Sequence, residues 1–592
     1  MTTGKVAGCS PQSEGWPRVL RVHGFRSWVG RAVALAGALL ALTTFPAEAQ
    51  TQGDPAAQEL RRQQERQRIL REQQEMAPDV RLESGQAPVA DRVPLDESPC
   101  FEIQQIILDG DEAGRFRWAL QTADPADDPA TGRCLGTQGV NVVLKRVQNA
   151  VIGRGFVTTR VLAAPQDLKA GTLTLTVVPG RVRAVRFADA TSPRATAWNA
   201  VPVRAGELLN LRDIEQALEN FQRLPTVTAD IQIVPAEGDD ARSGESDLVI
   251  EWQQRAPARA NLTFDDSGSP ATGKLQGGAT ASLDNALGWN DLFYINLGHD
   301  VLNGGHKGTT SRTAHYDVPF GYWLLGATAS DYEYHQAVAG ANETYVYSGS
   351  SRNAEFNLSR LLFRNATIKA GAYTRGWWRE SDNFIDDTEV LVQRRRTAGW
   401  ELGVTYKQFL GSATFDARVA YRRGTGAFDS LAAPEEAFGE GTSRPKLMTA
   451  DAQISVPFRL GSQQLRYSGS ARAQWNRTPL VPQDRFSIGG RYTVRGFDGE
   501  LSLSGERGWL LRNDLSLALG GGQELYLGVD YGRVSGPSTQ WQLGDELAGT
   551  VLGLRGGHGR LNWDLFVGAP LHEPDGFAVA YTTTGFSLGW AY

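Results

Sequence analysis

The sequence predicts an exported protein with an N-terminal helix, an α+β region and an all-β membrane region, a C-terminal antiparallel transmembrane β-barrel of about 16 strands. Three observations predict it: an export signal at the N-terminus, a repeated strand–helix pattern over 100–256, and period-two alternation over 257–592. A mean hydropathy of −0.33 and 21% charged residues would by themselves suggest a soluble protein. The low mean hydropathy is still compatible with a membrane barrel, because half of the residues in every membrane-spanning strand are polar.

Residues 1–49 have the pattern of a secretory signal peptide. Five basic side chains precede an apolar run at Ala32–Leu42, and small residues at Ala47 and Ala49 form a cleavage site. We expect cleavage between Ala49 and Gln50. The apolar run is too short for a transmembrane helix, which needs about 20 residues. The mature chain is therefore expected either to be released into an oxidising compartment or to insert as a β-barrel.

Residues 50–76 are expected to form a polar helix. The stretch Asp54–Met76 is rich in Gln, Arg and Glu, which favour a helix, but it has few apolar positions. It cannot be a core helix, so it is either a helix in a wet channel or a solvated, partly disordered tail. Residues 77–99 contain four prolines and are expected to be an extended linker.

Two copies of one small α+β unit are expected at 100–180 and 181–256, each with the order β–α–α–β–β. Val140–Ile152 has apolar residues at helical spacing, and Leu211–Phe221 shows the face of a second helix. Runs of β-branched and alternating residues between turn signals indicate strands. The expected strands are Phe101–Leu108, Val157–Leu162 and Leu173–Val178 in the first copy, and Val182–Phe187, Val227–Val234 and Leu248–Gln253 in the second.

The three cysteines divide between the signal and the first α+β copy. Cys9 leaves with the signal, so the mature chain holds one pair, Cys100 and Cys134. In an oxidising compartment we expect a disulfide, which would stabilise the fold by about 4 kcal/mol in the chain-entropy model. A metal site is not expected, because two cysteines without a nearby histidine cannot complete a tetrahedral ligand set.

The alternating region has the two faces of a membrane barrel. Its apolar face carries aromatic residues at strand ends, as in interfacial girdles, and its other face carries Gly and charges of both signs, as in a wet lumen. The last strand places Phe586, Leu588, Trp590 and Tyr592 on one face. A soluble β-domain is the alternative, but single β-domains rarely exceed about 250 residues. At about 20 residues per strand and turn, the region holds roughly 16 strands.

Several motifs resemble those of a known family. Cys100–Ile103, Gly132–Gly136, Gly155–Arg160, Gly171–Leu173 and Val178–Arg181 resemble a first POTRA domain, and Gly206–Pro225 resembles a second. The most specific motif is the tetrad Val494-Arg495-Gly496-Phe497, which lies inside the expected barrel. Together they make the chain similar to the outer-membrane transporters of two-partner secretion (the TpsB type, or haemolysin secretion/activation proteins, of the Omp85 superfamily).

The resemblance implies that the tetrad lies on a loop folded into the barrel. A buried charge needs a partner, and alternation places Asp530 on the lumen face within Gly528-Val529-Asp530-Tyr531-Gly532, which resembles the family's wall motif. We therefore expect an Arg495–Asp530 ion pair that holds the loop. Gly496 would allow a sharp turn and Phe497 would pack in the lumen. The alternative is a surface loop with an exposed arginine.

The resemblance also implies the location and partners of the chain. The barrel would lie in the outer membrane of a Gram-negative bacterium, contacting its lipids, with the POTRA domains in the periplasm. The polar helix would plug the pore, and Tyr592, with Phe586 and Trp590, would signal to the barrel-assembly machinery. Periplasmic chaperones would assist biogenesis.

The implied function is secretion of a large TpsA-like exoprotein of the haemagglutinin or haemolysin type. The POTRA domains would recruit it by strand addition. The pore would conduct it without ATP as plug and loop are displaced. No cofactor and no nucleic acid are expected.

Other functions fit the sequence less well. A barrel-assembly insertase shares the tetrad, but insertases usually have more POTRA repeats and lack the Gln-rich helix. An outer-membrane hydrolase would need a catalytic motif, and none of the six histidines of the mature chain lies in a motif such as G-x-S-x-G. We therefore do not expect an enzyme. A passive porin would not need two periplasmic binding units.

Overall fold

The computed structural model describes residues 55–75, 78–83, 85, 92–189, 191–239, 241–302, 305 and 307–592. The expected signal peptide, with its cleavage site at Ala49 and Gln50, lies outside these residues. Among the helices of the described ranges, none is both long and apolar enough to cross a membrane.

The first unit, residues 100–180, is a three-stranded sheet with one long helix against it. Strand β5 (Thr172–Val178) lies in the centre, parallel to β2 (Gln105–Gly110) and antiparallel to β4 (Arg160–Leu162). Helix α3 (Thr137–Gly153) buries valines of one face at the predicted spacing. The smaller elements are β1 (Phe101–Ile103), β3 (Arg133–Leu135), α2 (Ala113–Phe116), and the 3-10 turns η1 (Arg117–Thr122) and η2 (Leu168–Ala170).

The second unit repeats the sheet but not the full helix pair. Its strands β6 (Arg181–Phe187), β8 (Glu245–Gln254) and β7 (Val227–Pro235) form a sheet in that order. Helix α4 (Leu211–Gln222) is capped at its N-terminus by Asn210, whose side chain accepts a hydrogen bond from the backbone N–H of Arg212. The expected order had two helices, but the described part of 188–210 forms turns. Two prolines in this stretch, which lack the N–H that a helix needs, account for the difference.

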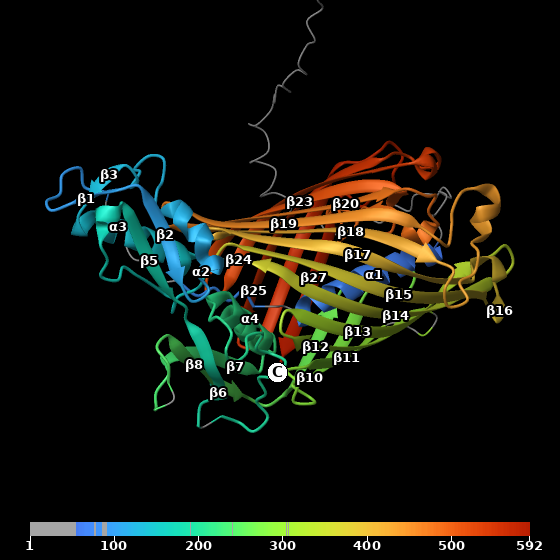
Figure 1. The fold of residues 1–592 in the computed structure, drawn as a ribbon. Coiled ribbons are helices and arrows are strands. Elements are labelled where there is room, and N and C mark those ends of the chain that lie inside the picture. The colour runs from blue at the N-terminus through green and yellow to red at the C-terminus, as the bar shows by residue number, and fades with distance from the viewer. Residues whose placement is uncertain are drawn as a thin grey trace, which may run out of the picture. The chain divides into compact units, whose positions relative to one another are not determined.

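The C-terminal region is a closed antiparallel barrel of 16 long strands (Figure 1), which confirms the predicted number. It closes where β27 pairs with β9, and the two-residue β16 adds only to the end of β15. The long strands are β9 (Ala258–Asp265), β10 (Gln276–Asp284), β11 (Leu292–Asp300), β12 (Gly308–Phe320), β13 (Trp323–Ala339), β14 (Thr344–Arg364), β15 (Ile368–Ile385), β17 (Arg395–Leu410), β18 (Ala413–Thr425), β19 (Lys446–Leu460), β20 (Gln463–Asn476), β23 (Arg507–Gly520), β24 (Gln523–Ser535), β25 (Glu546–His558), β26 (Leu561–His572) and β27 (Thr583–Ala591). The short elements of this region are β16 (Thr388–Glu389), β21 (Phe486–Ile488), β22 (Leu503–Gly505), η3 (Leu391–Gln393), η4 (Pro434–Phe438), η5 (Pro482–Asp484) and η6 (Pro537–Trp541).

Alternation along the strands separates the two faces of the barrel wall. In β24, Leu525, Leu527 and Val529 are exposed on the outside, whereas Tyr526 and Asp530 are buried on the inside. At the end of the chain, the rings of Trp590 and Tyr592 stack with centroids 6.0 Å apart, and Phe586 packs beside the ring of Phe264.

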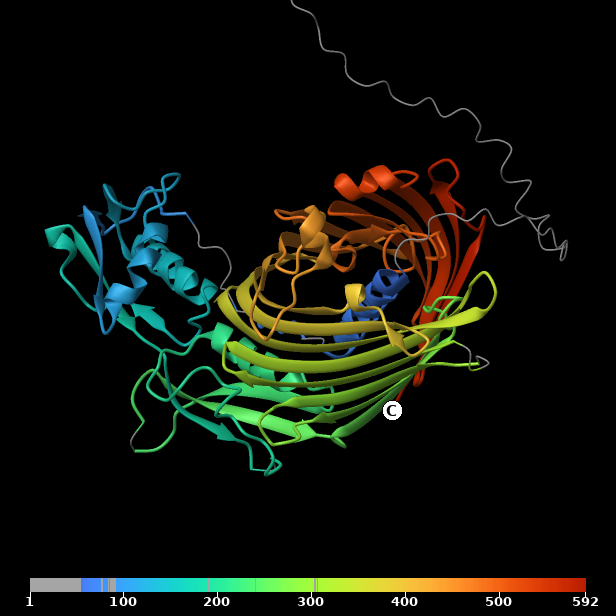
Figure 2. The same ribbon diagram turned by 90° about the vertical axis from the view of Figure 1, so that its right-hand side faces the viewer.

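Helix α1 (Pro55–Gln74) lies inside the barrel (Figure 2). Its hydrogen-bond partners come from strands on several sides of the lumen, including β13, β14 and β20. The polar stretch is therefore a helix in the channel rather than a solvated tail.

Candidate pore lock and plug

The tetrad lies on a loop, residues 489–502, that connects β21 to β22 and folds against the inner wall. The guanidinium of Arg495 donates from Nε to Asp530 Oδ2 at 2.6 Å and from Nη2 to Asp530 Oδ1 at 2.7 Å. The backbone N–H of Arg495 donates to the same carboxylate at 3.0 Å. The side chains of Arg495 and Asp530 are only 5% and 1% exposed. The structure thus brings the two predicted residues together in a buried, bidentate pair.

A second carboxylate, which the sequence did not single out, completes this site. Asp514 of β23 accepts a hydrogen bond from Arg495 Nη2 at 2.6 Å. Two wall arginines lie farther away: Arg512 is 3.8 Å from Asp530, and Arg555 is 3.8 Å from Asp514. Both carboxylates that bind Arg495 therefore belong to the barrel wall, and the wall arginines compensate them only weakly.

Glycines make room for the loop against the wall. Gly496 has a φ of 99°, and a Cβ there would lie 2.4 Å from the carbonyl oxygen of Ala569. A Cβ at Gly549 of β25 would lie 1.8 Å from the carbonyl oxygen of Arg495, and one at Gly528 would lie 2.7 Å from its guanidinium. A Cβ at Gly532 would lie 2.9 Å from the side chain of Val494. Only residues without a side chain allow the loop backbone to approach this closely.

The other side of the loop is apolar. Val494 and Phe497 are buried, and the Phe497 ring lies 6.1 Å from the ring of Phe577, edge to face. The cluster also contains Ile488, Leu503, Leu510, Val534 and Leu547. The loop is therefore held by a charged contact on one side and by apolar burial on the other.

Helix α1 is held by polar contacts, and its charges are balanced largely within the helix. Glu59 is buried, accepts a hydrogen bond from Tyr332 of β13, and pairs at 3.2 Å with both Arg62 and Arg66 of α1 itself. Arg62 also donates to the carbonyl oxygen of Gly499 at 2.5 Å, which joins the helix to the pore loop.

Farther along α1, both members of each ion pair between helix and wall have a second partner. The helix residue finds it on the helix, and the wall residue finds it on the wall. Arg71 pairs with Glu355 of β14 at 2.9 Å and lies 3.9 Å from Glu75. Glu355 in turn lies 3.9 Å from Arg375 of the wall. The Glu65–Arg472 pair, at 2.8 Å, has the same form, with partners on helix and wall at 2.9 and 3.7 Å. A cavity of about 830 Å³ remains in the lumen beside the helix.

The chain after α1 is fastened at the rim of the barrel. The backbone N–H groups of Val80 and Leu82 donate to Glu219 and Glu215 of α4 at 2.9 and 2.8 Å. Arg364, at the end of β14, donates to the carbonyl oxygen of Val80 at 2.6 Å. The expected linker is thus extended here, but it is bound to the second unit and the barrel rather than loose.

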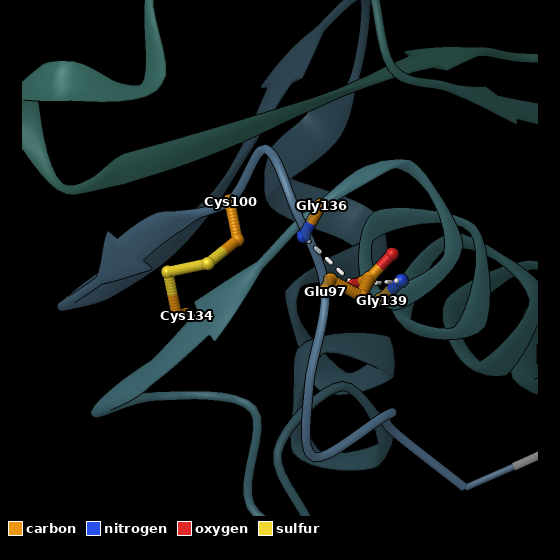
Figure 3. The surroundings of a disulfide bond; sticks show 5 residues. All are labelled: Glu97, Cys100, Cys134, Gly136 and Gly139. Atoms are coloured by element: carbon orange, nitrogen blue, oxygen red, sulfur yellow. Dashed lines mark hydrogen bonds between the residues drawn. A yellow bond between two sulfur atoms is a disulfide. The ribbon is translucent and has the colours of Figure 1, made fainter.

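Near the first unit the chain is fixed again, beside the disulfide (Figure 3). Cys100 and Cys134 form a disulfide, with their Cα atoms 5.2 Å apart. Cys100 directly precedes β1, and Cys134 lies in β3, which pairs with β1. The carboxylate of Glu97 accepts backbone N–H groups of Gly136 and Gly139, each at 2.8 Å, at the start of α3. Partial burial acts to raise the pKa of Glu97, but these donors lower it overall.

Asp128 also holds this segment of the chain. Its carboxylate accepts the backbone N–H of Val93 at 2.9 Å and pairs with Arg146 of α3. The Val93 N–H, together with the guanidinium of Arg146, holds the pKa of Asp128 below its usual range. Within the described ranges, no group of three or more His, Cys, Asp or Glu side chains is arranged to hold a metal ion.

Comparison with known proteins identifies the family of this chain. The model of the haemolysin secretion/activation proteins ShlB/FhaC/HecB matches residues 244–556, more than half of the chain. A ShlB-type POTRA model matches residues 101–180, and a second POTRA model matches 181–235. The chain belongs to the haemolysin secretion/activation family. The two α+β units are its POTRA domains.

Relatives cover nearly the whole chain. Outer membrane transporter CdiB-2 of Burkholderia pseudomallei is 36% identical over 93% of this chain and 97% of its own length. The structure of CdiB from Acinetobacter baumannii matches with a TM-score of 0.80 at 32% identity, covering 91% of this chain and 99% of that one. CdiB from Escherichia coli, at 24% identity and a TM-score of 0.81 over 92% of this chain and 100% of that one, shares the fold.

The family establishes the general function of the chain. It is an outer-membrane transporter of two-partner secretion, with its POTRA domains in the periplasm and a secreted exoprotein as its partner. The rim that contacts the second POTRA domain is therefore the periplasmic rim.

Proposed function

We propose that the chain secretes a TpsA-like exoprotein of the haemagglutinin or haemolysin type through the barrel lumen, and that α1 is the element that leaves while the pore loop stays. The supporting observation is where the charge partners lie. Glu59 takes Arg62 and Arg66 with it when α1 leaves. If the loop left instead, Arg495 would be separated from its carboxylate partners, Asp530 and Asp514, which belong to the wall. An uncompensated buried charge is costly, so the helix is the element that can be displaced at lower cost. This revises the expectation that plug and loop move together.

Recognition of the exoprotein is proposed to occur on the POTRA domains. Both POTRA sheets have edge strands, β2 and β4 in the first and β6 and β7 in the second. An extended chain can add to such an edge by main-chain hydrogen bonds. Transport needs no ATP in this scheme, because folding outside the cell gives it direction.

Maturation and assembly complete the proposal. The signal would be cleaved between Ala49 and Gln50, periplasmic chaperones would deliver the chain, and the barrel-assembly machinery would read the C-terminal strand. Phe586 and Trp590 of β27, together with the terminal Tyr592, would form that assembly signal.

Deletion of this gene tests the proposed function directly. The secreted exoprotein partner should then accumulate in the periplasm, and the wild-type chain supplied in trans should restore it to the medium. An Arg495→Ala chain should insert into the membrane but restore secretion poorly. If the exoprotein still reaches the medium in the deletion strain, the proposal is wrong.

A further inference from the structure

An exposed aromatic cluster lies at the junction of the second POTRA domain and the barrel. Trp198, between β6 and α4, is 61% exposed. Its ring lies 6.2 Å from the ring of Trp289, in the turn between β10 and β11, and 5.6 Å from the ring of Phe320, at the end of β12. A single exposed apolar side chain is ordinary, but a contiguous aromatic group marks an interaction surface.

The cluster continues the lipid-facing surface of the barrel. Phe320 is paired with Trp323 across the β12–β13 hairpin, and both side chains are exposed on the outside of the wall. The outward residues Ile295 and Leu297 of the neighbouring β11 are exposed as well. Trp198 therefore extends, from the POTRA domain, the aromatic belt that a barrel places at its periplasmic interface.

The position of Trp198 is fixed by the next residue. The side-chain amide of Asn199 donates to the carbonyl oxygen of Pro319 at 3.0 Å, and its backbone carbonyl accepts the N–H of Gly321 at 2.7 Å. Asn290 donates to the Asn199 side chain at 2.9 Å. These contacts, in which the Asn199 side chain is buried, hold the Trp198 backbone against the rim.

Two arginines beside the cluster suit a phosphate-bearing surface. The guanidinium of Arg360 lies 4.7 Å over the Trp323 ring. Arg194 is exposed and bonds to the carbonyl oxygen of Asn285 in the turn that carries Trp289. Exposed tryptophans with arginines nearby match the phospholipid headgroup layer, where Trp is enriched and Arg reaches phosphate.

We propose that Trp198 inserts into the periplasmic headgroup layer of the outer membrane, so that the second POTRA domain is anchored in phospholipid as well as on the barrel. The occupant of the surface is the lipid leaflet. A secreted partner or a second copy of the chain would be a different occupant, and the test separates these.

The test uses the full chain in phospholipid nanodiscs, with a fluorescent probe attached at Trp198→Cys. The native cysteines are joined in a disulfide and will not react. Leu162→Cys is the matched control, because Leu162 is a similarly exposed apolar residue of the first POTRA domain. Phospholipids with a nitroxide near the headgroup should quench the probe at 198 and shift its emission to the blue. The probe at 162 should show neither change.

A probe at 198 that behaves like the one at 162 would overturn the proposal. So would quenching that needs added exoprotein, or that depends on protein concentration through self-association. Photoactivatable phospholipid supplies a check on the unsubstituted chain. It should label the peptide that contains Trp198 and not the one that contains Leu162, and the reverse result would also overturn the proposal.

Discussion

The pore loop and helix α1 both occupy the barrel lumen, but they are held in opposite ways. The loop places a buried guanidinium on two wall carboxylates and buries Phe497 on its other side. The helix has its buried carboxylate neutralised by its own arginines, and its wall pair Arg71–Glu355 is 31% and 28% exposed. Buried charges depend on their partners far more than partly exposed ones do. This difference is the basis for our proposal that the loop is the fixed part of the pore and the helix the removable one.

Removing the central arginine should have the largest effect. Arg495→Ala leaves Asp530 buried without its main partner, and should cost about 3–5 kcal/mol of barrel stability. Urea unfolding of the protein in lipid vesicles measures this. Arg477→Ala, at an exposed arginine after β20, is the control and should change little. The double variant with Asp530→Ala should recover part of the loss. Additive losses would show that the pair is not coupled.

The second largest loss of stability should come from adding a side chain where the loop packs against the wall. Gly549→Ala places a methyl group against the Arg495 carbonyl oxygen, so the loop or the strand must shift, at a cost of about 1–3 kcal/mol. Gly557→Ala on the same strand is the matched control, because the nearest atom to its Cβ would be 3.4 Å away. The same unfolding measurement compares them. Equal stability of the two variants would argue against close packing of the loop.

Loosening the helix should have a smaller effect on stability. Arg71→Ala removes one partly exposed pair, Arg71–Glu355, and should weaken helix retention by less than about 1 kcal/mol. Because the helix occupies the lumen, ion conductance in planar bilayers should rise modestly, whereas the unfolding free energy should stay near that of the wild type. A loss of stability as large as that of Arg495→Ala would erase the distinction between loop and helix.

The smallest effect concerns the part of the linker beside the first POTRA domain, which Asp128 and Glu97 hold in place. The pKa of Asp128 and that of Glu97 are lowered in the folded state, so their contribution is present at neutral pH and is lost as pH falls below about 4. Denaturant unfolding of the POTRA region at a series of pH values should show this loss. Asp128→Asn should weaken the pH dependence. A stability that is the same at pH 3 and pH 7 would contradict it.

The sequence predicts the parts of this site that are local. Alternation places Asp530 on the inner face, and the tetrad marks Arg495, because both signals lie within a few residues. Asp514 and Gly549 were missed, since their roles depend on which strands lie beside the loop. The partners of α1 also come from strands far apart in the chain, and a polar helix carries no pattern that identifies them. Trp198 lies in a turn region where one tryptophan gives no periodic signal.

The central claim is tested most directly by two engineered cysteine pairs in the full chain, assayed for secretion of the exoprotein. Each pair is joined by a short, reducible thiol cross-linker, because long native side chains leave a cysteine pair too far apart for a direct disulfide. One joins α1 to the wall at Gln67→Cys and Ser330→Cys, whose native side chains bond at 2.8 Å. The other joins the loop to the wall at Arg491→Cys and Asp266→Cys, whose native side chains pair at 2.6 Å. Cross-linking should stop secretion by the first variant and leave it intact in the second, and reductive cleavage of the cross-linker should restore the first. Secretion with the helix locked, or a block with only the loop locked, would contradict the account.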